Sequence, residues 1–133
     1  MSASGSLSQA LVLLQSGKLD DALHRLDHLT TAQPANADAF GWLAIAHARA
    51  GHSDQAQRAV QRAIEISPAN ASFYLTAANI QQDLGNLAAA LRLLQQSVQI
   101  NPAFAEAHNN MGIIQSDLGR SMPQYEPLSK PFA

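Results

Sequence analysis

The stretch "ADAFGWLAIAHARAG", from Ala37 to Gly51, and the stretch "SDQAQRAVQRAIEIS" that follows it, from Ser53 to Ser67, decide the fold of this chain. In the first stretch, four residues share one helical face at spacings i, i+3, i+4 and i+7: Phe40, Leu43, Ala44 and His47. In the second, another set does the same: Ala56, Val60, Ala63 and Ile64. This periodicity is typical of two amphipathic helices.

Each stretch has its own start and stop signals. Asn36 precedes the first helix as a candidate N-cap, and Gly51 ends it, since glycine adopts the left-handed conformation at little cost. Asp54 lies in the first turn of the second helix, where the helix dipole favours a carboxylate. Pro68 ends that helix because it pushes the preceding residue out of the α region. The pair is predicted to be antiparallel.

This helical pair is repeated along the chain. Glycines recur every 34 residues at Gly17, Gly51, Gly85 and Gly119, and prolines keep the same interval at Pro34, Pro68 and Pro102. Small residues form two further columns, Ala22, Ala56 and Ala90 in one and Ala10, Ala44, Ala78 and Gly112 in the other. A repeated unit that cannot bury its apolar face alone has to stack on its neighbours. The small columns would let paired helices touch.

These columns resemble the tetratricopeptide repeat (TPR) family, with an aromatic–x–x–Leu–small opening, a small residue in the second helix and a closing proline. The stretch "AEAHNNMGIIQSDLGR", 105–120, is similar to the first helix of such repeats in O-linked N-acetylglucosamine transferases. The resemblance implies an all-α, right-handed superhelix of about seven antiparallel helices. We expect them near 6–16, 20–33, 37–50, 54–67, 71–84, 88–100 and 105–118.

The resemblance also sets the domain boundaries. A TPR domain at 1–120 would hold repeats at 3–36, 37–70 and 71–104 and a partial repeat at 105–119. Three prolines after it, Pro123, Pro127 and Pro131, forbid a second helix there. The tail 121–133 is therefore predicted to be extended or disordered.

Composition excludes several function classes. Apolar residues make up 47% of the 133 residues, the net charge is −2 and cysteine is absent. The slightly negative charge argues against binding of nucleic acid. No apolar run is long enough to span a membrane. The lack of cysteine excludes thiolate chemistry and zinc sites with sulfur ligands. His24 and His28, at i and i+4, are expected on a solvated face without a metal. We predict no cofactor, no enzyme activity and a cytoplasmic location.

Trp42, the only tryptophan, is expected to face the concave groove that first helices line in this family, because Phe40 already fills the aromatic column. The alternative is that Trp42 packs on Leu11 and Leu14. The predicted groove residues are Leu7, Leu11, Trp42, Ile45, Arg49, Asn79, Asp83, Glu106, Asn109, Asn110 and Asp117. We expect a ligand with an apolar anchor and a basic or amide-rich end.

The leading hypothesis is a protein-interaction scaffold that holds a peptide or helix of a partner protein. Two alternatives stay open: a regulatory or substrate-recognition domain of a larger glycosyl-, sulfo- or methyltransferase, and a self-assembly module. A clamp for the C-terminal tail of a chaperone is disfavoured, since neither register of the groove supplies the cations that a carboxylate requires.

The end of the chain suggests self-association. A solenoid that stops on a single helix exposes an apolar seam unless something covers it. We expect that seam at Met111, Ile114 and Leu118, covered by a second copy of the chain or by the tail residues Tyr125, Leu128 and Phe132. A monomer with a frayed last helix is the alternative.

Overall fold

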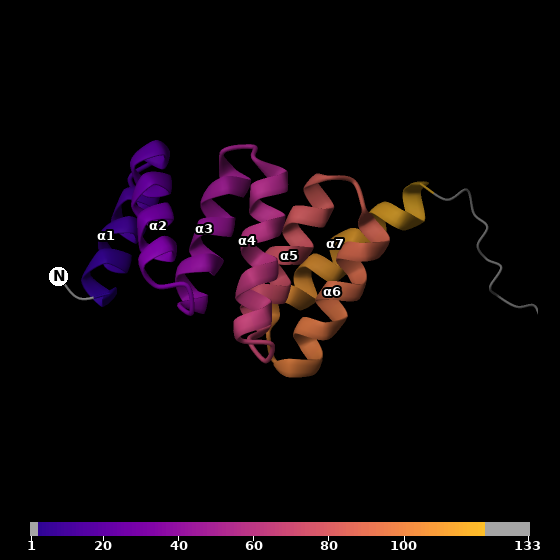
Figure 1. The fold of residues 1–133 in the computed structure, drawn as a ribbon. Helices are drawn as coiled ribbons and strands as arrows, with labels where there is room; N and C mark the ends of the chain where they lie inside the picture. Colours follow the sequence, from indigo (N-terminus) through magenta and orange to yellow (C-terminus); the bar gives the residue numbers. More distant parts are fainter. Residues whose placement is uncertain (1–2, 122–133) are drawn as a thin grey trace, which may run out of the picture.

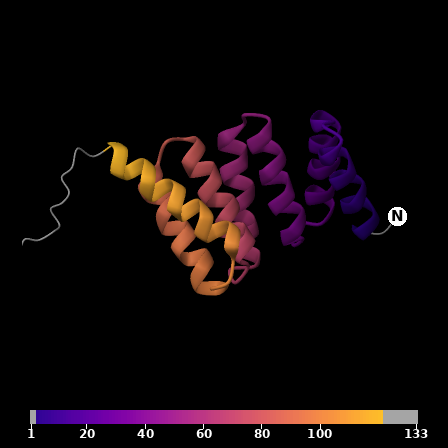
Figure 2. The same cartoon turned by 180° about the vertical axis from the view of Figure 1, so that it is seen from behind.

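The computed structural model describes residues 3–121 as a row of stacked helices without a strand. The seven helices are α1 (Ala3–Gln15), α2 (Leu19–Ala32), α3 (Ala37–Arg49), α4 (Ser53–Ile66), α5 (Ala71–Asp83), α6 (Leu87–Ile100) and α7 (Ala105–Ser121). Figure 1 shows them following one another from α1 and α2 at one end to α7 at the other, and Figure 2 shows α7 lying across α5 and α6 from behind. The predicted all-α solenoid is confirmed.

Three of the four periodic glycines close the turn inside a helix pair. Their φ angles are +79° at Gly17, +81° at Gly51 and +85° at Gly85. At Gly51, the backbone N–H donates to the carbonyl of Ala48 at 3.1 Å, and the N–H of His52 donates to that of His47 at 2.8 Å. Equivalent bonds recur in the other two turns. These bonds satisfy carbonyl groups that the helix end leaves free, and they reverse the chain.

Gly119 does not end a helix, although the periodicity predicts that it does. It lies inside α7, which continues past the expected end near residue 118 to Ser121. A glycine ends a helix where the next residues donate N–H groups back to the last turn; elsewhere it is tolerated at a cost of about 1 kcal/mol. Gly5 lies inside α1 in the same way, and α1 begins before the expected residue 6. Ser121 is helical, and the rest of the predicted tail lies outside the described residues.

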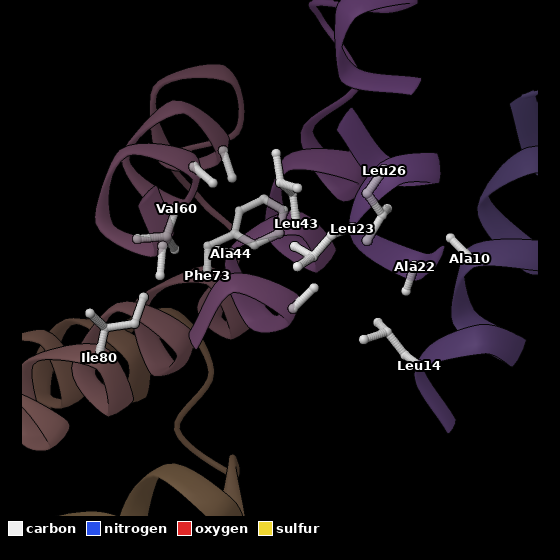
Figure 3. Close-up of a cluster of buried hydrophobic side chains, with 14 of the residues drawn as sticks. Ala10, Leu14, Ala22, Leu23, Leu26, Leu43, Ala44, Val60, Phe73 and Ile80 are labelled. Carbon is white, nitrogen blue, oxygen red and sulfur yellow. The ribbon is translucent and has the colours of Figure 1, made fainter. Parts of the chain in front are cut away.

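The small-residue columns form the contact between paired helices. Ala22, Ala56 and Ala90 are fully buried, as are their counterparts on the first helices, Ala10, Ala44 and Ala78. Figure 3 shows several of these alanines among larger side chains such as Leu26 and Phe73. Gly112, the last member of its column, is exposed, because within residues 3–121 no second helix packs along α7 as α4 packs along α3. Its partial repeat therefore lacks this contact.

Side chains also join each pair to the loop before it. Asn36 accepts a hydrogen bond from the N–H of Ala39 at 3.1 Å, as predicted for an N-cap. Asn70, one repeat later, accepts from the N–H of Ser72 at 2.9 Å. The buried hydroxyl of Ser97 donates to the carbonyl of Ala71 at 2.9 Å and fixes α6 against the start of α5.

The apolar seam expected on α7 is not exposed. Ile114 is fully buried, and Met111 and Leu118 are half-buried against the same cluster, which includes Leu94 of α6. The two preceding members of the Ile114 column, Ala46 and Ile80, are buried too, whereas the first member, Val12, is exposed on the terminal helix α1. The exposed apolar residue of α7 is instead Ile113, at 46%. The other predicted contact residues, Tyr125, Leu128 and Phe132, lie outside the described residues.

Candidate peptide-binding groove

A groove of about 660 Å³ lies between α3, α5 and the start of α7. Its apolar part consists of Gly41, Trp42, Ile45, Ala48, Phe73, Leu75, Ile80 and Phe104. Its polar part consists of Asp38, Arg49, Asn70, Ser72, Thr76, Asn79 and Glu106. An apolar floor with a few polar groups at its rim is the usual composition of a ligand site.

One glycine controls the width of the groove. A Cβ atom on Gly41 would lie 2.6 Å from Cε1 of Phe73, which is far inside van der Waals contact. Glycine at this position therefore lets α3 and α5 approach closely, and the ring of Phe73, only 6% exposed, becomes part of the floor. Trp42, the next residue, and Ile45, one turn further along α3, line the same space.

The charges of the groove lie at opposite edges. Asp38 and Glu106 are in the first turns of α3 and α7, whereas Arg49 is in the last turn of α3. Because the odd-numbered helices run parallel, one edge of the groove is acidic and the other carries a cation. All three side chains are exposed, so a charged ligand can reach them from solvent.

Two amide side chains bridge α5 and α7. The Nδ2 of Asn110 donates to the Oδ1 of Asn79 at 2.9 Å. This bond fixes the Asn79 side chain, whose Nδ2 has no acceptor among the described residues. Asn79 lines the groove, so this N–H group is available to a carbonyl of a bound chain.

The structure brings together part of the predicted site. Trp42, Ile45, Arg49, Asn79 and Glu106 line the groove. Trp42 lines the groove, as expected, and is half-buried because it also packs against the main core cluster.

The other predicted residues lie elsewhere. Leu7 and Leu11 pack against the core, and Asp83 is exposed at the end of α5. Asn109 and Asp117 line a separate shallow hollow of about 410 Å³ on α7, and Asn110 acts only through Asn79.

Sequence reasoning missed several apolar members of the groove, among them Phe73, Ile80 and Phe104. One signal was available for Phe104, which occupies the column where Asn36 and Asn70 act as N-caps. An aromatic residue at a capping position gives up a hydrogen bond, which indicates another role for the side chain.

Outside the groove, one pair of histidines joins α3 to α4. The Nδ1 atoms of His47 and His52 lie 3.1 Å apart. Burial lowers the pKa of His47; Asp27 opposes this effect, and His52 and Arg58 add to it. Within residues 3–121, no three acidic or histidine side chains gather as metal ligands. None of the described helices has the length and apolarity to cross a membrane.

Comparisons with known proteins agree on one family. A family model described as "Tetratricopeptide repeat" matches residues 13–80, and one described as "TPR repeat" matches residues 78–119. No curated protein sequence matches the chain.

Among solved structures, the first TPR of Spaghetti (RPAP3) bound to the HSP90 peptide SRMEEVD is 20% identical, with a TM-score of 0.82 over 88% of this chain and 93% of that one. The type III secretion translocator chaperone SycD of Yersinia enterocolitica is 22% identical, with a TM-score of 0.80 over 90% of this chain and 95% of that one. An O-GlcNAc transferase mutant of Thermobaculum terrenum is 20% identical, with a TM-score of 0.83 over 94% of this chain but 23% of that one.

Proposed function

Because the chain belongs to the tetratricopeptide repeat family, we propose that it is a protein-interaction scaffold that binds a peptide segment of a partner protein in the groove between α3, α5 and α7. The observation that carries the proposal is the half-buried side chain of Trp42, which lines the groove together with apolar residues of α3 and α5. Rigid aromatic side chains in a concave surface are typical anchors of binding energy.

The lining of the groove favours a particular kind of peptide. A bulky apolar side chain would pack against Trp42, Ile45 and Phe104. A lysine or arginine on the same peptide would lie at the acidic edge, near Asp38 and Glu106, and mainly raise the association rate. A backbone carbonyl of the peptide would accept a hydrogen bond from Asn79. Leu7 and Leu11, which the sequence suggested as further contacts for the apolar side chain, pack against the core and are not part of the proposed site.

A chaperone C-terminal carboxylate is not the ligand we propose. One solved relative holds such a peptide, SRMEEVD. Here Arg49 is the single cation among the lining residues, and Asp38 and Glu106 share the groove with it. A terminal carboxylate together with acidic side chains needs several cations to offset its desolvation.

A second candidate function is substrate recognition within a larger enzyme. It is favoured by the match to an O-GlcNAc transferase, of which this chain covers 23%. In either case we propose that residues 3–121 bind and do not catalyse, and we place the protein in the cytoplasm. The two candidates are distinguished by the coding sequence on either side of these 133 residues. The second candidate requires a catalytic domain in the same reading frame, and the first does not.

The test starts from peptides selected on the full chain from a displayed random library. Their dissociation constants are then measured by fluorescence anisotropy. Trp42→Ala should weaken binding by more than about tenfold, as expected for the loss of an aromatic anchor. Val12→Ala is the matched control, since Val12 is 59% exposed on α1 and lies outside the groove.

Two outcomes decide the proposal. Binding that weakens with Trp42→Ala and also with Asp38→Asn, while both variants keep the helical circular dichroism of the parent, supports it. If every selected peptide binds both variants as tightly as the parent, the groove is not the site.

A further inference from the structure

A second groove lies on the even-numbered helices, away from the site proposed above. It consists of two adjoining hollows of about 600 and 670 Å³, one along α4 and one along α6. Both are lined by Gln81 of α5 and Leu93 of α6, so they adjoin there, and together they are called the channel below. None of the residues that line this channel lines the groove between α3, α5 and α7.

The channel carries an excess of positive charge. Arg58, Arg62 and Arg92 line it, against the single carboxylate of Glu65. Arg62 is already engaged, with Nη1 at 3.3 Å from Glu65. Arg58 and Arg92 have no hydrogen bond or ion pair with any described residue. The channel therefore presents two available guanidinium groups on a chain whose net charge is −2.

The repeat fixes where these two groups lie. Arg58 and Arg92 are 34 residues apart, so they occupy the same position on α4 and α6. These helices flank α5, whose Ala77 and Gln81 form the bottom of the channel between them. Neighbouring helix axes lie about 8–10 Å apart, so two helices separated by a third lie more than about 10 Å apart. An extended chain covers that distance in about four residues.

The remaining lining suits a polypeptide. Leu93 is half-buried where the two hollows adjoin and offers an apolar contact. Six glutamine side chains surround it, each able to donate to and accept from a backbone: Gln57, Gln61, Gln81, Gln95, Gln96 and Gln99.

We infer that this channel is a second binding surface, which takes an extended acidic peptide segment. Carboxylates four positions apart in the peptide reach Arg58 and Arg92, and the apolar residue midway between them contacts Leu93. In an extended chain these three side chains point to the same face. Carboxylate–guanidinium bonds are the strong, directional contacts of such a complex.

The lining distinguishes a peptide from nucleic acid. No aromatic residue lines the channel, so it has no platform on which bases stack. Two available arginines neutralise few phosphates, and affinity for nucleic acid depends on many such contacts.

The test uses a dye-labelled peptide, GSEALAEGS, and its neutral counterpart GSQALAQGS, titrated with the full chain and followed by fluorescence anisotropy. The acidic peptide should bind more tightly than the neutral one, with an affinity that falls as salt rises. The double variant R58Q/R92Q should weaken binding of the acidic peptide by about tenfold or more. The matched control K18Q/R25Q removes the same charge from α2 and the turn before it, and should change binding less than about twofold.

Every result bears on the inference. All four substituted side chains are exposed, and Arg25 alone among them has a hydrogen bond within the described residues, to Gln9 of α1 at 2.7 Å. Thermal unfolding checks that both variants keep the fold. Equal affinity of parent and R58Q/R92Q overturns the inference. Loss of binding in Trp42→Ala instead places the peptide in the first groove and overturns it too. If a labelled oligothymidylate binds more tightly than the peptide, and its binding depends on Arg58 and Arg92 in the same way, the ligand of the channel is nucleic acid and not a peptide.

Discussion

The two grooves of this protein come from the same repeat but differ in character. The groove between α3, α5 and α7 is floored by aromatic and aliphatic side chains, and its charges of opposite sign lie at separate edges. The channel along α4 and α6 lacks aromatic residues and is lined by arginine and glutamine. Behind both, the alanine columns between paired helices are fully buried.

The difference shows how a repeat separates folding from recognition. Positions at the contact of paired helices accept only small residues, since close packing leaves no room for more. Positions two residues away point away from that contact and are free to carry other chemistry. Arg58 and Arg92, each two residues after a column alanine, are therefore equivalent, whereas Trp42 has Thr76 as its counterpart. One scaffold can thus present two unrelated surfaces.

The largest effect is expected from a change beneath both grooves. Leu94 is fully buried in the cluster that includes Leu75, a wall of the first groove, and packs beside Leu93 of the second. Leu94→Ala should lower the free energy of unfolding by about 2–5 kcal/mol, through lost burial and the cavity left behind. Urea unfolding followed by circular dichroism measures this, and both peptide affinities should fall together. Loss of binding in only one groove would show that the grooves have separate cores.

A smaller effect should separate the grooves. Gly41→Ala places a Cβ against the ring of Phe73 and should cost about 1–3 kcal/mol, because the ring has to shift. Affinity should fall for the groove between α3, α5 and α7 and stay constant for the channel. Gly112→Ala is the matched control: it is also a helical glycine, but nothing lies within 4 Å of its added Cβ, so it should stabilise α7 by about 0.5–1 kcal/mol. Equal effects of the two substitutions would contradict the close approach of α3 and α5.

The smallest effect concerns pH at the joint between α3 and α4. Burial holds the pKa of His47 below its ordinary value of 6.5, so the unfolded chain binds more protons just below that pH. His47 therefore lowers stability as pH falls from 7 through 6.5 toward its folded pKa. One repeat later the same contact is neutral, with Asn86 donating to Gln81 at 2.9 Å.

That neutral pair supplies the control. The double variant His47→Gln with His52→Asn reproduces the amide contact, and its unfolding free energy should decline less between pH 7.5 and 5.5 than that of the parent. The unfolding free energies come from urea titrations at each pH. Parallel pH profiles for the two proteins would refute a role for this pair.

Much of the fold is predictable from the sequence because it depends on local or periodic signals. The glycine and alanine columns correctly place the turns at Gly17, Gly51 and Gly85 and the helix contacts at Ala22, Ala56 and Ala90. The 34-residue period alone does not predict the roles of Gly112 and Gly119, because within the described residues no second helix follows α7 to form a turn or a contact with them.

The groove is less predictable than the fold. Which side chains line it depends on how far α3, α5 and α7 approach one another, a distance set by contacts such as Gly41 with Phe73. Helical spacing alone places Trp42 and Ile45 on the correct face of one helix. It does not reveal that Phe104, from the loop before α7, closes the same space.

The turns at Gly17, Gly51 and Gly85 have a consequence that concerns chirality. Their φ angles are positive, and no atom lies within 4 Å of an added Cβ. The obstacle to a side chain there is thus the handedness of the amino acid and not a lack of space. D-alanine, introduced by chemical synthesis, has its preferred conformation in this region. It would restrict the unfolded chain while its preferred backbone angles match those of the folded turn, a gain of roughly 0.4–1 kcal/mol at each turn. Each 34-residue unit therefore contains one position at which a mirror-image residue fits better than any of the natural L-amino acids.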